Sequence, residues 1–235
     1  MTAALLAGAR GVAVHGHIAA ARLRAPDGLS VQIACCAVDA SGFSSNQLSR
    51  NDARAALRLP GNAAVLLVEG GVREPSGRCL RSPRASPAPS QCVPGLEGPC
   101  PALARQAEVR GCDDFVRTGA DTILAGLAVA DVVLDLDPVS SGAASAMIDA
   151  GLATGLPVVG YRHGPAAMLP RPLAICVDYA ENTANEIAAG VADLLGIATH
   201  CGSIASEARQ YLRQNRSPER AALAYLRGAH AMTQH

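Results

Sequence analysis

The sequence contains no lysine and no tryptophan, and it is poor in aromatic residues, with two Phe and four Tyr in 235 residues. A hydrophobic core must therefore be built from Ala, Val, Leu and Ile. The length of 235 residues is enough for one large domain or two small ones, and 49% hydrophobic residues are enough for a sizeable core. The 20 basic residues are all arginines, and 20 acidic residues balance them. This balance argues against a nucleic-acid binder, which needs a basic face to displace phosphate counterions.

Long hydrophobic runs are absent as well. Residues 124–136 come closest to the roughly 18 apolar residues of a membrane-spanning helix, but two aspartates interrupt them. Residues 1–14 lack the charged start and apolar core of a secretory signal, so we expect a cytoplasmic protein whose eight cysteines are reduced. The cysteine spacing is too irregular for a zinc knuckle, and His15 and His17 have no identifiable third ligand. We expect neither a metal nor another cofactor.

Short apolar runs alternate with helical patterns, which predicts an α/β fold with a Rossmann-like parallel sheet and helices on both faces. The runs are rich in Val, Ile and Leu and mostly unalternated, as is typical of strands buried on both faces. The predicted strands are 12–14, 31–38, 63–68, 132–136, 156–159 and 173–177. The predicted helices are 51–58, 120–130, 142–154 and 183–195, with a helical pair over 203–232.

Residues 74–101 do not fit this alternation. Pro, Ser, Cys, Arg and Gly make up 20 of these 28 residues, and seven of the 15 prolines lie here. Proline removes backbone donors, and this composition cannot bury enough surface to fold. We therefore predict a disordered or extended insert, which is unusually long for a compact domain.

The candidate site lies in residues 130–164, ADVVLDLDPVSSGAASAMIDAGLATGLPVVGYRHG. The pattern predicts a strand, a tight turn, a helix and a second strand. Ser140, Ser141 and Gly142 would begin the helix with free backbone N–H groups, and such a start at the carboxyl end of a parallel strand favours a phosphate. Asp149, one or two turns further on, could present its carboxylate to sugar hydroxyls. The alternative is that the two serines only cap the helix and that Asp149 is a solvated polar residue.

This segment resembles the donor-binding part of glycosyltransferases built from two Rossmann-like domains, the GT-B architecture, and especially family 4. Residues 130–132, Pro138 and 155–159 match the pattern that carries the nucleotide-sugar site in that family. The first of two family carboxylates falls near Ser141, which is not acidic. The second falls near Asp149, whose spacing to the following glycine is one residue longer than in the family.

The resemblance continues upstream. Residues 31–39 and 51–60 are similar to the linker and first helix that open the second domain of the family, and 63–71 to its first strand and glycine-rich turn. In the family, an arginine and a lysine after that turn hold the donor diphosphate. The resemblance therefore implies that Gly71 and Arg73 lie at the diphosphate, with no lysine to follow them. Arginine can hold a phosphate bidentately, although the two residue types are not interchangeable at a shaped site.

The resemblance also divides the chain into three parts. Residues 1–30 would be a remnant of the acceptor domain with the linker. Residues 31–200 would be the nucleotide-sugar-binding domain, including the irregular segment 74–101, and 201–235 a C-terminal helical pair. Most of the acceptor domain would then be absent, so we expect a truncated enzyme that transfers nothing by itself. In the family the last helix covers the first domain, so here its apolar face, with Leu223 and Leu226, would be exposed and could form a homodimer.

The function that the resemblance implies is transfer of a hexosyl group from a nucleotide-diphosphate sugar to an acceptor that the sequence does not identify. Arg73 and the helix start at Ser140 to Gly142 would neutralise the leaving diphosphate. Two alternatives stay open. One is a nucleotide-sugar 2-epimerase, which also has a helix N-terminus after a Ser-Gly pair. The other is a non-catalytic remnant or binding module of the same fold.

Overall fold

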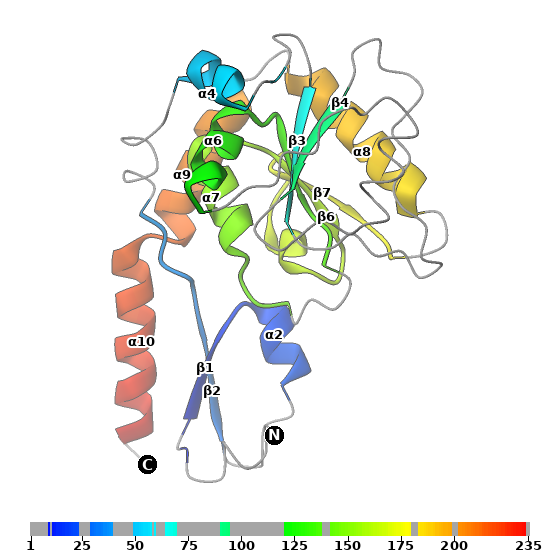
Figure 1. Ribbon diagram of the computed structural model, residues 1–235. Helices are drawn as coiled ribbons and strands as arrows, with labels where there is room; N and C mark the ends of the chain where they lie inside the picture. The colour runs from blue at the N-terminus through cyan, green and yellow to red at the C-terminus, as the bar shows by residue number, and fades with distance from the viewer. Residues whose placement is uncertain are drawn as a thin grey trace.

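The chain folds around two parallel β-sheets (Figure 1). The larger sheet has five strands in the order β4-β3-β5-β6-β7, and the smaller sheet pairs β1 with β2. This architecture confirms the predicted Rossmann-like α/β fold. The computed structural model describes residues 9, 11–23, 29–39, 49–57, 59, 64–69, 90–94, 120–137, 142–179, 183–198 and 202–233.

Side chains of the large sheet are buried on both of its faces. These strands are β3 (Ala64–Glu69), β4 (Ser90–Pro94), β5 (Val132–Asp135), β6 (Val158–Tyr161) and β7 (Ala174–Val177). Each neighbouring pair is parallel. Successive side chains point to opposite faces, so Val65 and Leu67 join one hydrophobic cluster while Leu66 and Val68 join the other. Burial on both faces explains why the strand sequences show no polar alternation.

Helices cover the two faces unequally (Figure 1). One cluster joins the sheet to α4 (Arg50–Ala56), α6 (Ala120–Val129), α7 (Ala146–Thr154) and α9 (Gly202–Asn215). The other joins it to α8 (Thr183–Ala198) through Ile187, Val191 and Leu194. A single turn of 3-10 helix, η1 (Pro165–Met168), follows β6. None of the helices in the described part of the chain is long and apolar enough to cross a membrane.

The small sheet forms a narrower second lobe. β1 (Gly11–His15) is followed by α2 (His17–Arg22) and pairs with β2 (Ser30–Ala34), and α10 (Pro218–Thr233) runs alongside both strands (Figure 1). The Tyr225 hydroxyl of α10 lies 3.2 Å from His15 Nε2 of β1. The final helix thus ties the end of the chain to its beginning.

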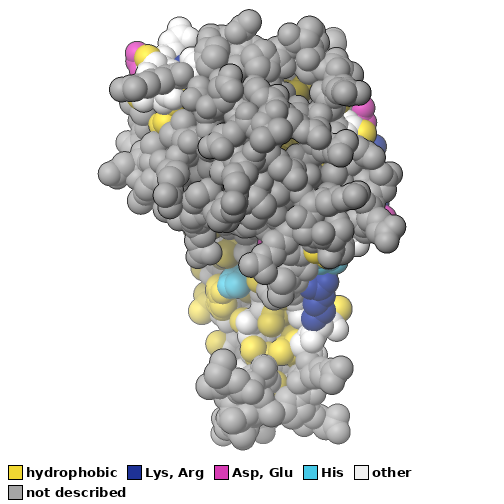
Figure 2. All heavy atoms as spheres, turned by 45° about the vertical axis from the view of Figure 1, so that its right-hand side comes forward, with side chains coloured by type: hydrophobic (Ala, Val, Ile, Leu, Met, Phe, Trp, Pro, Cys, Tyr) yellow, Lys and Arg dark blue, Asp and Glu magenta, His cyan; other side chains and the backbone are white. Residues whose placement is uncertain are grey.

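Apolar side chains of α10 remain partly exposed in this structure. Leu223 and Leu226 are 52% and 65% exposed. Hydrophobic side chains also gather over the narrow lobe in the view of Figure 2. The apolar face that the sequence predicted is therefore present, and its use in a homodimer stays a prediction.

Three predicted elements differ from the observed ones. β2 ends at Ala34 rather than at residue 38 and pairs with β1, so it is not a strand of the main sheet. α7 begins at Ala146 rather than at residue 142, because the backbone of Gly142 is left-handed (φ 77°) and cannot continue into a right-handed helix. Residues 90–94, within the segment predicted as disordered or extended, form β4 beside β3; residues 74–89 and 95–101 lie outside the described residues.

Candidate functional site

The carboxyl ends of β5, β6 and β7 meet at one edge of the large sheet, where the sequence predicts a phosphate site. The small lobe closes over this edge through α2. Arg22 Nη2 donates a hydrogen bond to the carbonyl oxygen of His163, 3.0 Å away in the segment after β6. In α/β proteins, ligands bind in the crevice outside the carboxyl ends of the strands. The contact between the lobes therefore lies where a ligand would be expected.

Two glycines allow the close approach of the lobes at this edge. Gly142, before α7, has φ 77°, and a Cβ placed there would lie 2.2 Å from Ile18 Cγ2 of α2. Gly16, before α2, has φ 109°, and a Cβ there would lie 2.6 Å from Met168 Sδ. Both positions combine a left-handed backbone with a contact that leaves no room for a side chain. Gly142, one of the predicted site residues, thus lies at the junction between the lobes.

Replacing Gly142 by alanine should lower the free energy of unfolding by about 1–3 kcal/mol. The methyl group must push α2 away, and the left-handed backbone is higher in free energy for alanine than for glycine. Urea denaturation followed by circular dichroism measures the change. Gly196→Ala is the matched control, because a Cβ at that position in α8 would meet nothing within 4 Å. The control should be neutral or stabilising by up to about 1 kcal/mol. Equal effects of the two substitutions would contradict the close contact at Gly142.

The start of α7 differs from the predicted phosphate cradle. Ser145 is the N-cap, and its hydroxyl accepts a hydrogen bond from the Ile148 N–H at 3.2 Å. Gly142 lies three residues before this cap, in non-helical backbone. Four of the predicted site residues, Gly71, Arg73, Ser140 and Ser141, lie outside the described residues. Gly142 therefore lies in non-helical backbone before the helix, and the contact of residues 140–142 with a phosphate stays a prediction.

Asp149 is buried and forms an ion pair with Arg216, at the junction of α9 and α10. Asp149 and Arg216 are each only 6% exposed. Burial raises the pKa of Asp149 to about 6, while the charge and hydrogen bond of Arg216 and the nearby His15 act in the opposite direction. The structure thus places the Asp149 carboxylate against a cation of its own chain. The contact of this carboxylate with sugar hydroxyls stays a prediction.

An aromatic cluster follows β6 and β7 at the same edge. The His163 ring stacks on Tyr161, with centroids 5.3 Å apart, and Tyr179 meets Tyr161 edge-on at 5.2 Å. Arg162 turns outward instead, and its Nε lies 2.9 Å from Oδ1 of Asp178. Both side chains of this ion pair are more than 60% exposed. The three rings therefore pack against one another, with Tyr161 buried, and Arg162 is engaged by Asp178 at this point.

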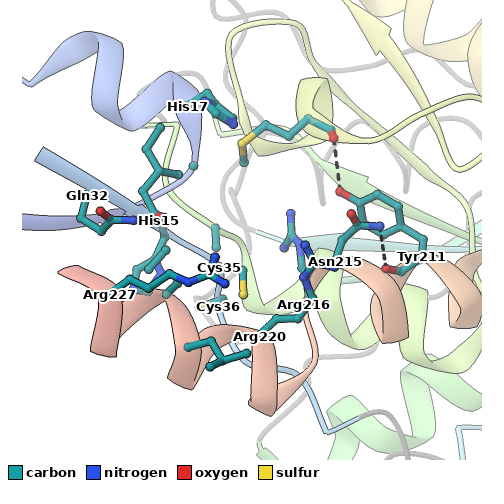
Figure 3. A pocket seen from close by; sticks show the side chains of 17 residues that line it. His15, His17, Gln32, Cys35, Cys36, Tyr211, Asn215, Arg216, Arg220 and Arg227 are labelled. Atoms are coloured by element: carbon teal, nitrogen blue, oxygen red, sulfur yellow. Dashed lines mark hydrogen bonds between the residues drawn. The ribbon is translucent and has the colours of Figure 1, made fainter. Parts of the chain in front are cut away.

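A cavity of about 740 Å³ opens beside this edge, between the small lobe and the junction of α9 and α10 (Figure 3). Ala144 and Met168 line it from the domain of the large sheet, and His15 and His17 line it from the small lobe. Arg216 also lines it. Among the described residues, no three His, Cys, Asp or Glu side chains are grouped as a metal site would require.

No protein-family model matches the sequence, and neither does any curated protein. Solved structures do match. The sucrose-phosphate synthase of Thermosynechococcus elongatus superposes with a TM-score of 0.67 at 19% identity, covering 98% of this chain and 60% of that one. HepE of Anabaena in complex with UDP-glucose superposes with a TM-score of 0.69 at 16% identity, and the match covers 97% of this chain and 64% of HepE. The C-terminal domain of the glycosyl transferase LpcC from Francisella tularensis superposes with a TM-score of 0.56 at 14% identity, and the match covers 77% of this chain and 99% of that domain.

This is the GT-B glycosyltransferase fold. The chain spans about 60–64% of the length of the first two structures. Nearly all of the isolated LpcC domain is matched, so the GT-B fold of this chain includes the large-sheet domain that lies C-terminal in LpcC. The resemblance predicted from the segment 130–164 is therefore confirmed at the level of the fold.

Proposed function

We propose that this chain is the donor-binding part of a glycosyltransferase that takes a hexosyl group from a nucleotide-diphosphate sugar. The observation that carries this proposal is the superposition with HepE bound to UDP-glucose, which covers 97% of the chain. The interlobe contact at the carboxyl edge of the large sheet supports the proposal, because it lies where α/β folds bind their ligands.

The donor would lie with its diphosphate near Gly71, Arg73 and residues 140–142. Backbone N–H groups and a guanidinium there would stabilise the negative charge that develops on the leaving diphosphate. The amides at the start of α7, beyond Ser145, add the positive end of a helix dipole. Holding the donor in one orientation would supply the remaining contribution of this part of the enzyme. The acceptor and its site are not part of this proposal.

Calorimetric titration with UDP, GDP and ADP tests the proposal directly. We expect at least one of them to bind with a Kd of about 1 mM or lower, which corresponds to about −4 kcal/mol or stronger binding. Arg73→Gln should weaken that binding by about tenfold or more, since a hydrogen bond to a charged group contributes about 1.5–3 kcal/mol. Arg213→Gln, an exposed arginine of α9, is the matched control and should bind as the unmodified chain does.

Two results would contradict the donor site. Absence of binding by all three nucleotides at millimolar concentrations would remove it altogether. Equal binding by the Arg73→Gln chain and the unmodified chain would remove the predicted role of Arg73. The comparisons support neither the 2-epimerase nor the binding-module alternative.

A further inference from the structure

The cavity between the small lobe and α10 has a chemistry that the donor site does not use. It is lined by three arginines, namely Arg216, Arg220 and Arg227, and no described residue that lines it is acidic. We propose that this cavity binds a phosphorylated small molecule, such as a sugar phosphate, through Arg220 and Arg227. This proposal does not depend on nucleotide binding at the sheet edge.

The positive charge of the cavity is only partly neutralised. Arg216 is paired with Asp149, which lies behind the wall of the cavity. Neither Arg220 nor Arg227 has an ion-pair partner among the described residues. Glu219, next to Arg220 in sequence, does not line the cavity. Two guanidinium groups are therefore available to an anion that enters.

The two arginines are placed to act together. They are seven residues apart on α10, which is nearly two helical turns, so both lie on one face about 10 Å apart along the axis. Leu223 and Ala224 lie between them and also line the cavity. A guanidinium can hold a phosphate through two parallel hydrogen bonds, which a neutral side chain cannot do. This face of α10 thus carries a cation on each side of the apolar pair Leu223 and Ala224.

The rest of the cavity suits the neutral part of such a ligand. Gln32 of β2 and Asn215 at the end of α9 bring amide groups to it from opposite walls (Figure 3). His17, at the start of α2, is exposed and adds a further polar ring. Side-chain amides both donate and accept hydrogen bonds, as sugar hydroxyls do. A volume of about 740 Å³ is within the usual range for small-molecule sites.

Calorimetry with glucose 6-phosphate, inorganic phosphate and glucose tests the proposal on the full chain. Glucose 6-phosphate should bind at least tenfold more tightly than glucose, because the phosphate contributes the charged hydrogen bonds. It should also bind more tightly than inorganic phosphate, which lacks the hydroxyls. Arg220→Gln and Arg227→Gln should each weaken its binding by about tenfold or more. Both arginines are exposed on a helix, so neither substitution should impair folding, which circular dichroism checks.

Arg213→Gln serves as the control for charge alone, because Arg213 is an exposed arginine that does not line the cavity. It should bind glucose 6-phosphate within about twofold of the unmodified chain. The affinity for whichever of UDP, GDP and ADP the chain binds should be the same in all three variants, which separates this site from the donor site. The proposal is overturned if inorganic phosphate binds as tightly as glucose 6-phosphate, or if Arg213→Gln weakens binding as much as the two cavity substitutions. Loss of nucleotide binding in the Arg220→Gln chain would also overturn it, since the cavity would then belong to the nucleotide site.

Discussion

Replacing Arg216 by methionine should lower the free energy of unfolding by about 3–5 kcal/mol at pH 7. The substitution removes one partner of a buried ion pair and leaves the Asp149 carboxylate without its cation. Methionine replaces the aliphatic stem of arginine and adapts to irregular spaces, so loss of packing should contribute less than loss of the charge. The backbone contacts of Arg216, including the hydrogen bond from Val38 N–H to its carbonyl oxygen at 2.9 Å, do not depend on the side chain. Urea denaturation of both chains at pH 7 measures the difference.

Arg162→Met is the matched control for this prediction. Arg162 also pairs with an aspartate, but both side chains of that pair are more than 60% exposed. Exposed ion pairs contribute only about 0–1 kcal/mol, so the control should remain close to the unmodified chain. Equal losses in the two variants would show that burial of the Asp149–Arg216 pair does not determine its contribution. A loss below about 1 kcal/mol for Arg216→Met would contradict the buried pair itself.

The strands β3, β5, β6 and β7 were predictable because their local sequence has a typical pattern. The unalternated Val and Leu runs of β5 and β6 are buried completely, as such runs in a parallel sheet are expected to be. The C-terminal helical pair was predictable for a similar reason, because Ser217-Pro218 provides both an N-cap and a first-turn proline for α10. These features require no knowledge of distant contacts.

The features that the sequence did not reveal depend on residues far apart in the chain. Asp149 and Arg216 are 67 residues apart, and nothing in the local pattern of either residue indicates the other. The start of α7 was misplaced because Ser140 and Ser141 are as suitable for capping as Ser145. The left-handed backbone of Gly142 and its close approach to Ile18 of α2 are not visible in the local sequence. β4 was missed because its five residues lie in a proline-rich segment without a strand pattern. They form a strand by pairing in parallel with β3, which the local sequence does not indicate.

The cavity is a stronger example of the same limit. Its polar residues come from β1, β2, α2, α9 and α10, which lie in two stretches about 170 residues apart in the sequence, 11–34 and 202–233. Each of these side chains is unremarkable where it stands in the sequence, since exposed arginines and histidines are common on helices and strand ends. Their concentration follows from the way α10 returns to pack along the small sheet. A site of this kind can be inferred from the fold but not from spacing.

The stability of the chain should fall as pH rises from about 4 to about 6 through the titration of Asp149. Its pKa is about 6 in the folded chain and about 3.8 when unfolded, so between these values the folded state binds more protons. Folding is then favoured by protonation, and the contribution is fully present below about pH 4 and lost above about pH 6. The difference between the two pKa values corresponds to about 3 kcal/mol. Urea denaturation at a series of pH values measures it.

Asp149→Asn is the control that isolates this effect from the other titrating groups, which both chains share. The free energy of unfolding of the unmodified chain, relative to that of the Asn variant, should decrease by up to about 3 kcal/mol between pH 4 and pH 7. In the Arg216→Met chain the decrease should extend to higher pH, because Arg216 lowers the pKa of Asp149 and its removal allows that pKa to rise further. Because Asp149 is protonated at low pH in both chains, the cost of removing Arg216 should be smaller at pH 5 than at pH 7. A difference between the unmodified and Asn chains that stays constant with pH, or increases with it, would show that burial does not dominate the titration of Asp149.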